Sequence, residues 1–448
     1  MKINFIKLLY EEENDMKKNK GITLVALVVT IVVLLILAGV SINLVLGDNG
    51  IIAKAKEAQR KSAEASQNDL IGMNELAQQL GEKINGSTGS GSGNGGTGGK
   101  TEPETVPYLP SDDFHYDTST SVDTGLIIAD SNGNEYVWVV VPRTTAVYKT
   151  TGLGKTTFTD ADYRSIETDL KNYTSTYGTT DDFSDTWYAD TNNEGWLTEA
   201  EYKTLKNDML KSVYENGGFY VGRYEAGIVE NRTLYGPTNS DGKYTIEGMP
   251  TPVTKADAYP YTWVTRTQAQ NLASNVNSGT KTSSLMFGVQ WDLVLAFMSR
   301  DTAKITSTDV LTKNSTAIGN YRDSVFQLSQ TGKYATMSAY NLSSTWNPST
   351  TPTANFVDTS RNKIAQSSDS NGILVTTGTS EKNKVMNIYD IAGNVWEWTL
   401  EKTSYVSYPC AERGGFFNND GSDSPAVDRG YNDTTYAYSS VGFRLSLW

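Results

Sequence analysis

Apolar and polar residues divide the chain into stretches of clearly different pattern. Residues 22–46 are almost all apolar, and no charged residue occurs between 21 and 47. At 1.5 Å of rise per residue, a helix of this length can cross the roughly 30 Å hydrocarbon core of a bilayer. The pattern therefore predicts a transmembrane helix over 22–47, preceded by a cytoplasmic leader over 1–21.

The lysines before this stretch predict its orientation. Lys17, Lys18 and Lys20 precede the apolar run and Asp48 follows it. Because positive residues are retained on the cytoplasmic side, everything after residue 47 is expected outside the cell membrane. The prediction is a single-pass membrane protein with an extracellular C-terminal part.

Three further segments follow the apolar stretch. Residues 48–84 are rich in Ala, Glu, Gln and Lys with apolar positions at helical spacing, which predicts an amphipathic helical stalk. Residues 85–105 are mostly Gly, Ser, Thr and Asn and are expected to form a flexible linker. The remainder, 106–448, is expected to form one extracellular domain.

The pattern of 106–448 favours an α+β domain rich in irregular loops. Short aromatic and β-branched runs alternate with Gly, Asn, Asp and Thr, which is typical of short strands joined by turns. Helical spacing is clearest over 261–276 and 286–299, with a further helical pattern over 202–214.

Charge and residue counts exclude several classes of function. The first 105 residues hold 11 basic and 12 acidic residues of the chain's 38 and 51, so 106–448 carries 27 and 39, or −12. This charge disfavours nucleic acid as a partner. A single cysteine, Cys410, and a single histidine, His115, exclude an internal disulfide, a CxxC pair and a multi-histidine metal centre. With 26 Tyr and 39 Gly, the composition favours a recognition surface.

The N-terminal motif resembles a type IV prepilin signal. Met16-Lys17-Lys18-Asn19-Lys20-Gly21 precedes the apolar helix, and the resemblance implies peptidase cleavage between Gly21 and Ile22. Family members usually carry Glu at the fifth mature position, where this chain has Ala26. The departure favours a minor filament subunit or a plain membrane anchor over a major filament subunit, because an incoming N-terminal amine would lack its counter-charge.

Three motifs lie near the C-terminal end, at residues 387–398 (NIYDIAGNVWEW), 413–416 (RGGF) and 442–445 (GFRL). Together they resemble the formylglycine-generating enzyme (sulfatase-modifying factor) family, whose fold is a variant of the C-type lectin fold. With weaker upstream matches, the resemblance covers about 125–448. The family's oxidase chemistry needs two cysteines after the Arg-Gly-Gly motif, and alignment on Gly414-Gly415 places Asn419 and Ser424 there. The resemblance thus implies a domain without this catalysis.

The resemblance also implies a structural calcium ion. Its oxygen ligands are expected from Asp390, Gly393, Val395 and Glu397, and a weaker second site from Asn355 and Asp369. The alternative is that Asp390 and Glu397 cap a turn while neighbouring tryptophans fill the core.

Residues 190–201 have the spacing of an EF-hand calcium loop. The candidate ligands are Asp190, Asn192, Glu194 and Glu201, with Gly195 at the sixth position. No clear helix precedes the loop and no second loop pairs with it, so an ordinary turn followed by an N-capped helix is the alternative.

The last loop of the domain is a candidate ligand-binding surface. Between 414 and 440 most residues are Asn, Asp, Ser, Thr, Tyr or Gly, as in antibody-like contact surfaces. The segment also resembles the variable region of lectin-fold proteins diversified by retroelements. The expected contacts are Asn418, Asn419, Tyr431, Tyr436 and Tyr438. A solvated, turn-rich loop is the alternative.

Two hypotheses of function follow. The first is a membrane-anchored or pilus-associated surface protein, resembling an adhesin, whose non-catalytic head binds an extracellular protein or glycan. The second is an architectural minor pilin or pseudopilin that contacts other pilins and primes or caps a type IV filament or secretion system. A third, enzymatic interpretation would require unprecedented chemistry that uses His115 or carboxylates.

Overall fold

A computed structural model describes residues 107–448 except 179–181, 337–345 and 351–371. These residues belong to the compact unit Ser92–Trp448. Among them no helix is both long and apolar enough to span a bilayer. The predicted leader, membrane helix and stalk, and with them Gly21 and Ile22, lie outside the described residues, as do Asn355 and Asp369.

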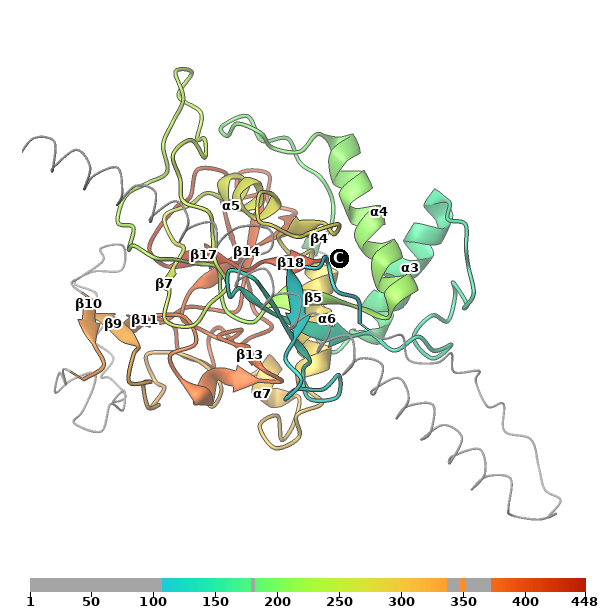
Figure 1. Ribbon diagram of the computed structural model, residues 1–448. Helices are drawn as coiled ribbons and strands as arrows, with labels where there is room; N and C mark the ends of the chain where they lie inside the picture. The colour runs from blue at the N-terminus through green and yellow to red at the C-terminus, as the bar shows by residue number, and fades with distance from the viewer. Residues whose placement is uncertain (1–106, 179–181, 337–345, 351–371) are drawn as a thin grey trace, which may run out of the picture. The chain divides into compact units, whose positions relative to one another are not determined.

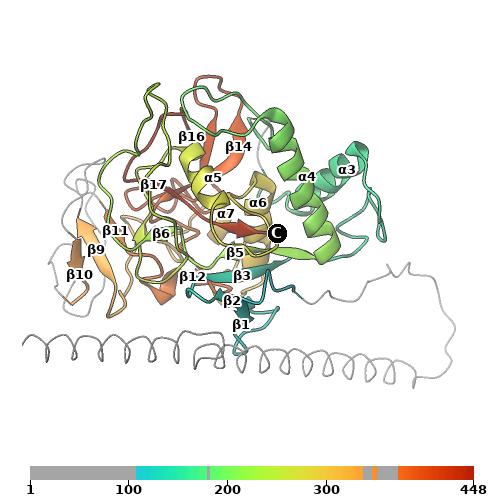
Figure 2. The same cartoon turned by 45° about the horizontal axis from the view of Figure 1, so that its top comes forward.

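The fold is mixed α/β, as predicted, and it contains two larger sheets. The first has the order β1-β2-β3-β5-β18-β8 and is antiparallel throughout (Figures 1 and 2). Its strands are β1 (Phe114–Tyr116), β2 (Ile127–Asp130), β3 (Glu135–Val140), β5 (Gly218–Gly222), β18 (Ser446–Leu447) and β8 (Ser283–Ser284). The strand nearest the C-terminus therefore lies inside the sheet, between β5 and β8.

The second larger sheet holds the motif-rich C-terminal segments. Its order is β16-β15-β14-β17, and β4 also pairs with β14. The strands are β4 (Phe183–Ser184), β14 (Trp396–Thr403), β15 (Cys410–Arg413), β16 (Arg429–Asn432) and β17 (Val441–Phe443). The β14–β17 pair is parallel and the other pairs are antiparallel.

Small sheets complete the strand structure. One has the order β10-β9-β11, and the pairs β12-β13 and β6-β7 stand apart. Their bounds are β6 (Gly227–Ile228), β7 (Tyr259–Pro260), β9 (Lys333–Thr336), β10 (Trp346–Pro348), β11 (Ile373–Val375), β12 (Lys384–Val385) and β13 (Ile388–Tyr389), with a 3₁₀ turn at Glu381–Asn383.

Three of the helices that the structure describes begin at a threonine cap. The described helices are α3 (Asp160–Tyr173), α4 (Glu199–Asn216), α5 (Arg266–Ser274), α6 (Gly288–Met298) and the short α7 (Asp309–Thr312). Thr159, Thr198 and Thr265 each accept from the N3 amide of the helix that follows, and the N3 side chain bonds back to the cap. The helices predicted within 261–276 and 286–299 are confirmed as α5 and α6.

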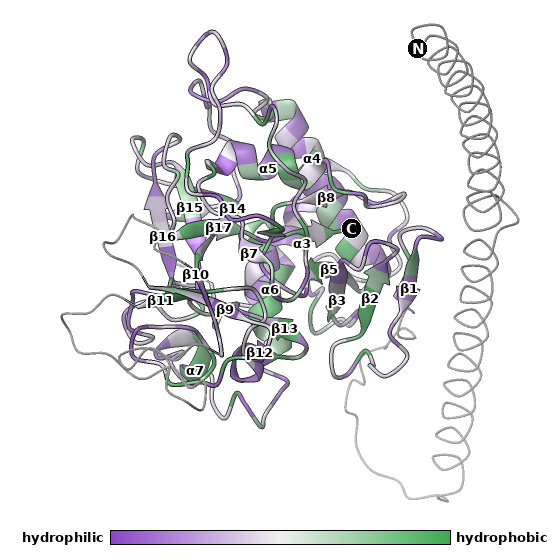
Figure 3. Ribbon diagram, turned by 60° about the vertical axis from the view of Figure 1, so that its left-hand side comes forward, coloured by the Kyte–Doolittle hydropathy of each residue, from purple (hydrophilic) through white to green (hydrophobic). Residues whose placement is uncertain are grey.

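Helix α6 forms the centre of the core. All but one of its residues are buried, because its sequence GVQWDLVLAFM is apolar on every side. It contacts β3 of the first sheet, β14 of the second and helix α3. Figure 3 shows hydrophobic colour on α6 and β2, while many peripheral loops are hydrophilic.

Candidate functional site

The three C-terminal motifs come together in the second sheet. Glu397 of β14 has Arg413 of β15 and Gly442 of β17 as its Cα partners. Two glycines then turn the chain away from β15. Gly414 has a φ of 90°, and a Cβ there would stand 2.6 Å from the Ile391 carbonyl oxygen. The first glycine of the Arg-Gly-Gly motif is therefore required because the backbone passes too close to Ile391 for a side chain.

The positions that the family resemblance assigns to the reactive cysteines have local structural roles. The side-chain oxygen of Asn419 accepts from the Phe416 amide at 3.1 Å, and the Asn419 amide donates to the Phe416 carbonyl at 2.9 Å. Ser424 is 7% exposed. Asn419 therefore stabilises the turn after Gly415, Ser424 is buried with its carbonyl close to Gly415, and neither residue offers a sulfur atom.

The single thiol is enclosed in the core. Cys410 of β15 is fully buried, and its sulfur lies 3.2 Å from the Tyr188 hydroxyl. Burial raises the pKa of Cys410 to about 11. The thiol is therefore protonated at neutral pH and is a poor nucleophile and metal ligand.

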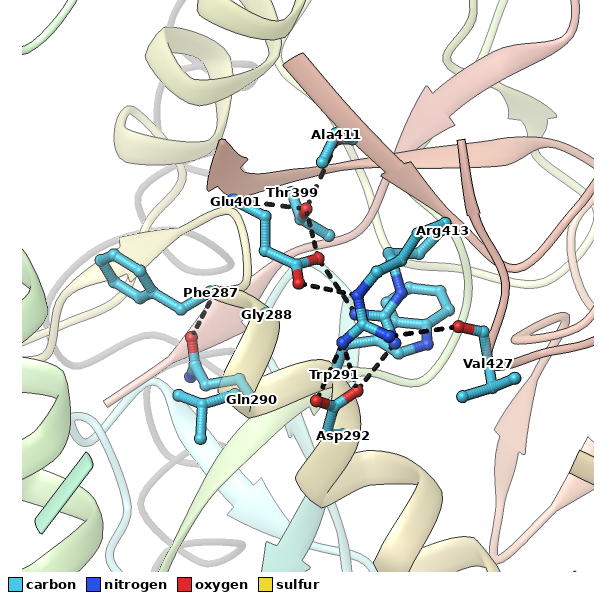
Figure 4. Close-up of polar contacts among 12 residues, drawn as sticks. Phe287, Gly288, Gln290, Trp291, Asp292, Thr399, Glu401, Ala411, Arg413 and Val427 are labelled. Carbon is cyan, nitrogen blue, oxygen red and sulfur yellow. Dashed lines mark hydrogen bonds and ion pairs between the residues drawn. The ribbon is translucent and has the colours of Figure 1, made fainter. Parts of the chain in front are cut away.

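A ring of four buried ions joins α6 to the second sheet (Figure 4). Arg413 bonds Asp292 at 2.8 Å and Glu401 at 3.0 Å, and Arg429 bonds the same two carboxylates at 2.9 Å each. Burial alone would raise the pKa of Glu401, but Arg429 and Arg413 lower it to about 2. Because each charge has two partners of opposite sign, the ring holds α6, β14, β15 and β16 in register.

A cavity of about 290 Å³ lies beside this ring. Its wall includes Lys171, Asp185, Asp292, Glu401 and Arg429, together with the first turn of α6. The Asp185 carboxylate accepts from the amides of Gly288 and Val289 at 2.7 and 3.1 Å, and burial raises its pKa to about 6. Asp185 thus caps α6, and no sequence motif had singled it out.

The expected calcium ligands form a different cluster. Both oxygens of Glu397 accept from Arg444, the shortest contact being 2.6 Å. The Asp390 oxygens accept from the Gly378 amide and the Asn383 side chain, at 2.8 and 3.2 Å. The Gly393 amide donates to the Gly414 carbonyl.

In this arrangement the Arg444 side chain supplies the positive charge beside Glu397. A cation at Glu397 would face the Arg444 guanidinium, and the Val395 amide donates to the neighbouring buried carboxylate of Glu225 at 3.3 Å. Within the described ranges no three Asp, Glu, His or Cys side chains gather as metal ligands. Burial raises the pKa of Asp390 and of Glu397.

The loop with EF-hand spacing joins neighbouring segments through hydrogen bonds. Asp190 accepts from Asn193 and Thr267, at 2.9 and 2.6 Å, and Asn192 donates to Thr434 at 2.6 Å. Glu194 accepts from the Asn239 amide group at 3.2 Å.

Glu201 faces the cap of the following helix. Its carboxylate accepts from the amide and the hydroxyl of Thr198, both at 2.8 Å. The turn followed by an N-capped helix, the alternative interpretation of this segment, is therefore what the structure contains.

The expected ligand contacts separate into three places. The Asn418 side-chain oxygen accepts from the Gly372 amide, so it lies with Asn419 near the Gly415 turn. Tyr431 is 43% exposed on β16, with its ring stacked on Tyr405 at 4.8 Å. Tyr436 and Tyr438 contact each other at 4.5 Å.

Sequence reasoning missed two exposed aromatic neighbours of Tyr431. Tyr405 and Tyr408 are each 47% exposed in the turn between β14 and β15, and Val406 between them is 91% exposed. The string Tyr405-Val406-Ser407-Tyr408, a run of apolar residues in a turn, is the signal that could have indicated them.

With this geometry in place, the comparison with known families is informative. Residues 328–447 match the family of sulfatase-modifying factor enzyme 1-like domains. The match includes all three C-terminal motifs and the strands β14, β15, β16 and β17, but it covers only part of the chain. Among the curated proteins none matches this chain.

Solved structures with similarity to the chain include three of low identity. Treponema denticola variable protein 1 has 13% identity and a TM-score of 0.24, covering 51% of this chain and 84% of its own. PvdO from Pseudomonas aeruginosa has 13% identity and a TM-score of 0.25, and the match covers 52% of this chain and 81% of PvdO. CarF has 13% identity and a TM-score of 0.23, and the match covers 70% of this chain and 88% of CarF.

Proposed function

We propose that the domain of residues 106–448 is a binding head of the sulfatase-modifying factor type, with a C-type-lectin-like topology and no oxidase activity. The observation that carries the proposal is the lack of an accessible thiol among the residues that the structure describes. Asn419 and Ser424 stand where the family resemblance expects two thiols, and Cys410 is enclosed beside Tyr188. Copper(I) binding and attack on a substrate cysteine both need accessible thiolates.

Exposed aromatic side chains support a recognition role. The ring of Tyr431 on the second sheet stacks on Tyr405, with centroids 4.8 Å apart, and lies tilted against Tyr408 at 6.0 Å. Tyrosines provide large, rigid contact areas with a polar end, as in antibody contact surfaces. An extracellular protein or glycan is the proposed partner.

Display outside the membrane is the second part of the proposal, and it rests on the sequence. The apolar stretch 22–46 and the lysines before it support a retained, N-in membrane helix. Filament incorporation, with cleavage between Gly21 and Ile22, is the architectural alternative. Deleting 106–448 separates the two, because a display role predicts loss of adhesion alone and an architectural role predicts loss of filament assembly.

Calcium remains a prediction from the sequence, and the structure does not favour it at Asp390 and Glu397. Thermal unfolding of the full chain in calcium and in chelator tests it. A calcium-dependent rise of the midpoint that is lost in Asp390→Asn would restore the prediction, and equal midpoints would refute it.

The catalytic part is tested with the full-length chain in lipid nanodiscs. The chain is incubated with copper(I), oxygen and a cysteine-containing sulfatase peptide, beside an active family oxidase as positive control. We expect no aldehyde product from this chain and the usual product from the control. Turnover that exceeds the protein-free background would refute the proposal.

A further inference from the structure

The loop after β6 exposes large apolar side chains beside a group of aromatic rings. Leu234 is 75% exposed, Tyr235 is 47% exposed, and Val229 at the start of the same loop is 83% exposed. Apolar side chains of this size are seldom left in water together without a partner. We refer to Leu234, Tyr235, Trp263, Tyr436 and Tyr438 as the Trp263 patch.

Three segments far apart in the chain form this patch. The Tyr235 ring lies 5.2 Å from Trp263 and 5.9 Å from Tyr438, in both cases edge to face. Trp263 and Tyr438 are 6.1 Å apart. The mutual contacts bring the loop after β6, the segment before α5 and the last loop of the domain to one surface.

Trp263 has two unusual features. Its φ is 61°, in the left-handed region that bulky residues rarely adopt. Its indole N–H is buried, the residue being 6% exposed, and has no acceptor in the described part of the chain. Strained backbone and an unsatisfied buried donor at one residue are both associated with functional sites.

The exposed loop is fixed at its base. A Cβ at Gly236 would stand 2.1 Å from the Gln268 side chain of α5, so the loop packs directly on the helix there. The same Gln268 amide donates to the Thr245 carbonyl at 2.7 Å. Leu234 and Tyr235 directly precede this anchored glycine, so the fold positions them beside Trp263.

We propose that the Trp263 patch docks a protein partner, in the form of a polypeptide segment with apolar side chains. Leu234 gains from burial only against apolar groups, which a partner's side chains supply and the hydroxyls of a glycan do not. Arg232, whose guanidinium lies 5.6 Å from the Tyr261 ring, adds to a Trp, Tyr and Arg composition that is typical of interface hot spots.

The net charge of residues 106–448 indicates the charge of the partner. Residues 106–448 carry 27 basic and 39 acidic residues, or −12, so a basic or neutral segment is attracted and a second copy of this chain is repelled. The inference rests on the proposed binding function and chooses protein over glycan as its partner.

The test uses the full-length chain in nanodiscs and a phage library of random 16-residue peptides. We expect selected peptides to combine apolar and basic residues. Leu234→Ser is expected to weaken their affinity at least tenfold. Tyr235→Ser, which removes the exposed ring beside Trp263, is expected to weaken it several-fold. Val325→Ser, at an exposed apolar site outside both the patch and the Tyr405, Tyr408 and Tyr431 group, is the control and should leave the affinity unchanged.

Several outcomes would overturn the inference. One is that no peptide is selected, and another is that affinity is indifferent to Leu234→Ser in a variant with the wild-type unfolding midpoint. A third is a glycan array signal, or self-association in sedimentation, that Leu234→Ser abolishes. If Tyr431→Ala removes peptide binding and Leu234→Ser does not, the binding head stands and the Trp263 patch is refuted.

Discussion

Arg444 holds the carboxylate of Glu397 with three hydrogen bonds of 2.6 to 3.1 Å, and both residues are 1% exposed. The remaining guanidinium donors reach the carbonyls of Gly222 and Tyr389, at 3.0 and 2.9 Å. One ion pair therefore links β14 of the second sheet to β5 of the first and to β13.

Removing one partner of this pair should strongly destabilise the domain. Glu397→Gln leaves the Arg444 charge buried without its counter-ion, which costs about 3–5 kcal/mol of unfolding free energy. Asp309→Asn is the matched control, because its pair with Lys313 is exposed on both sides and should contribute less than about 1 kcal/mol. Urea unfolding measures both, and equal losses for the two variants would contradict the role of Arg444.

Glu412 should make stability depend on pH. Burial raises the pKa of this β15 carboxyl from 4.5 to about 8, and one of its oxygens has no hydrogen-bond partner in the described structure. Because the folded pKa is the higher one, the contribution is present below pH 4.5 and is lost as pH rises through 8.

The Glu412→Gln variant isolates this effect. Gln keeps the shape and the acceptor for Asn432, whose side chain donates to Glu412 at 3.0 Å. Between pH 4.5 and 8 the stability of the wild type should fall relative to the variant by about 1.4 kcal/mol per pH unit. Denaturant unfolding at four pH values measures the difference, and parallel curves would show that Glu412 titrates normally.

Cys410 should resist thiol reagents until the domain unfolds. The thiol is fully buried and its pKa is raised to about 11, so both access and thiolate content are low. Iodoacetamide labelling at pH 7.5 should be at least a hundredfold slower in the native chain than in guanidinium. A Ser422→Cys variant, with its new thiol at an exposed position, provides the reactive control, and native labelling of Cys410 at a comparable rate would contradict the burial.

Thr198 should stabilise α4 without any metal. Thr198→Ala removes the reciprocal bonds with Glu201 and should cost about 1 kcal/mol. Because the loss comes from the cap, it should be the same in calcium and in chelator. Thr233→Ala in the exposed loop after β6 should be neutral, and a loss for Thr198→Ala that appears only in calcium would favour the EF-hand interpretation.

Local signals in the sequence predicted part of the fold. The helical patterns over 261–276 and 286–299 are confirmed, but each helix begins later than the apolar pattern does. For α5 the reason is the capping box of Thr265 with Gln268, a spacing that the sequence displays. The segment with EF-hand spacing ends in the same kind of signal. Its Thr198 and Glu201 form the capping box of α4.

Long-range pairing is what the sequence could not provide. Arg413 and Asp292 are 121 residues apart, and Glu397 and Arg444 are 47 apart. Neither separation has a period that indicates contact, so the sequence does not show that Arg444 is the counter-ion of Glu397. Tyr436 and Tyr438 were expected as contacts, but their neighbours Tyr235 and Trp263 belong to segments that only the fold brings together.

The position of β18 between β5 and β8 determines when the first sheet can be completed during synthesis. Hydrogen bonds from Ser446 and Leu447 are needed before the first sheet is continuous. During synthesis, β5 must wait with an unpaired edge until the ribosome has released residue 447, about 225 residues after the end of β5 at Gly222. The first sheet is therefore expected to become complete only once residues 446 and 447 have left the ribosome, so most of the domain must stay soluble with one strand edge open until then.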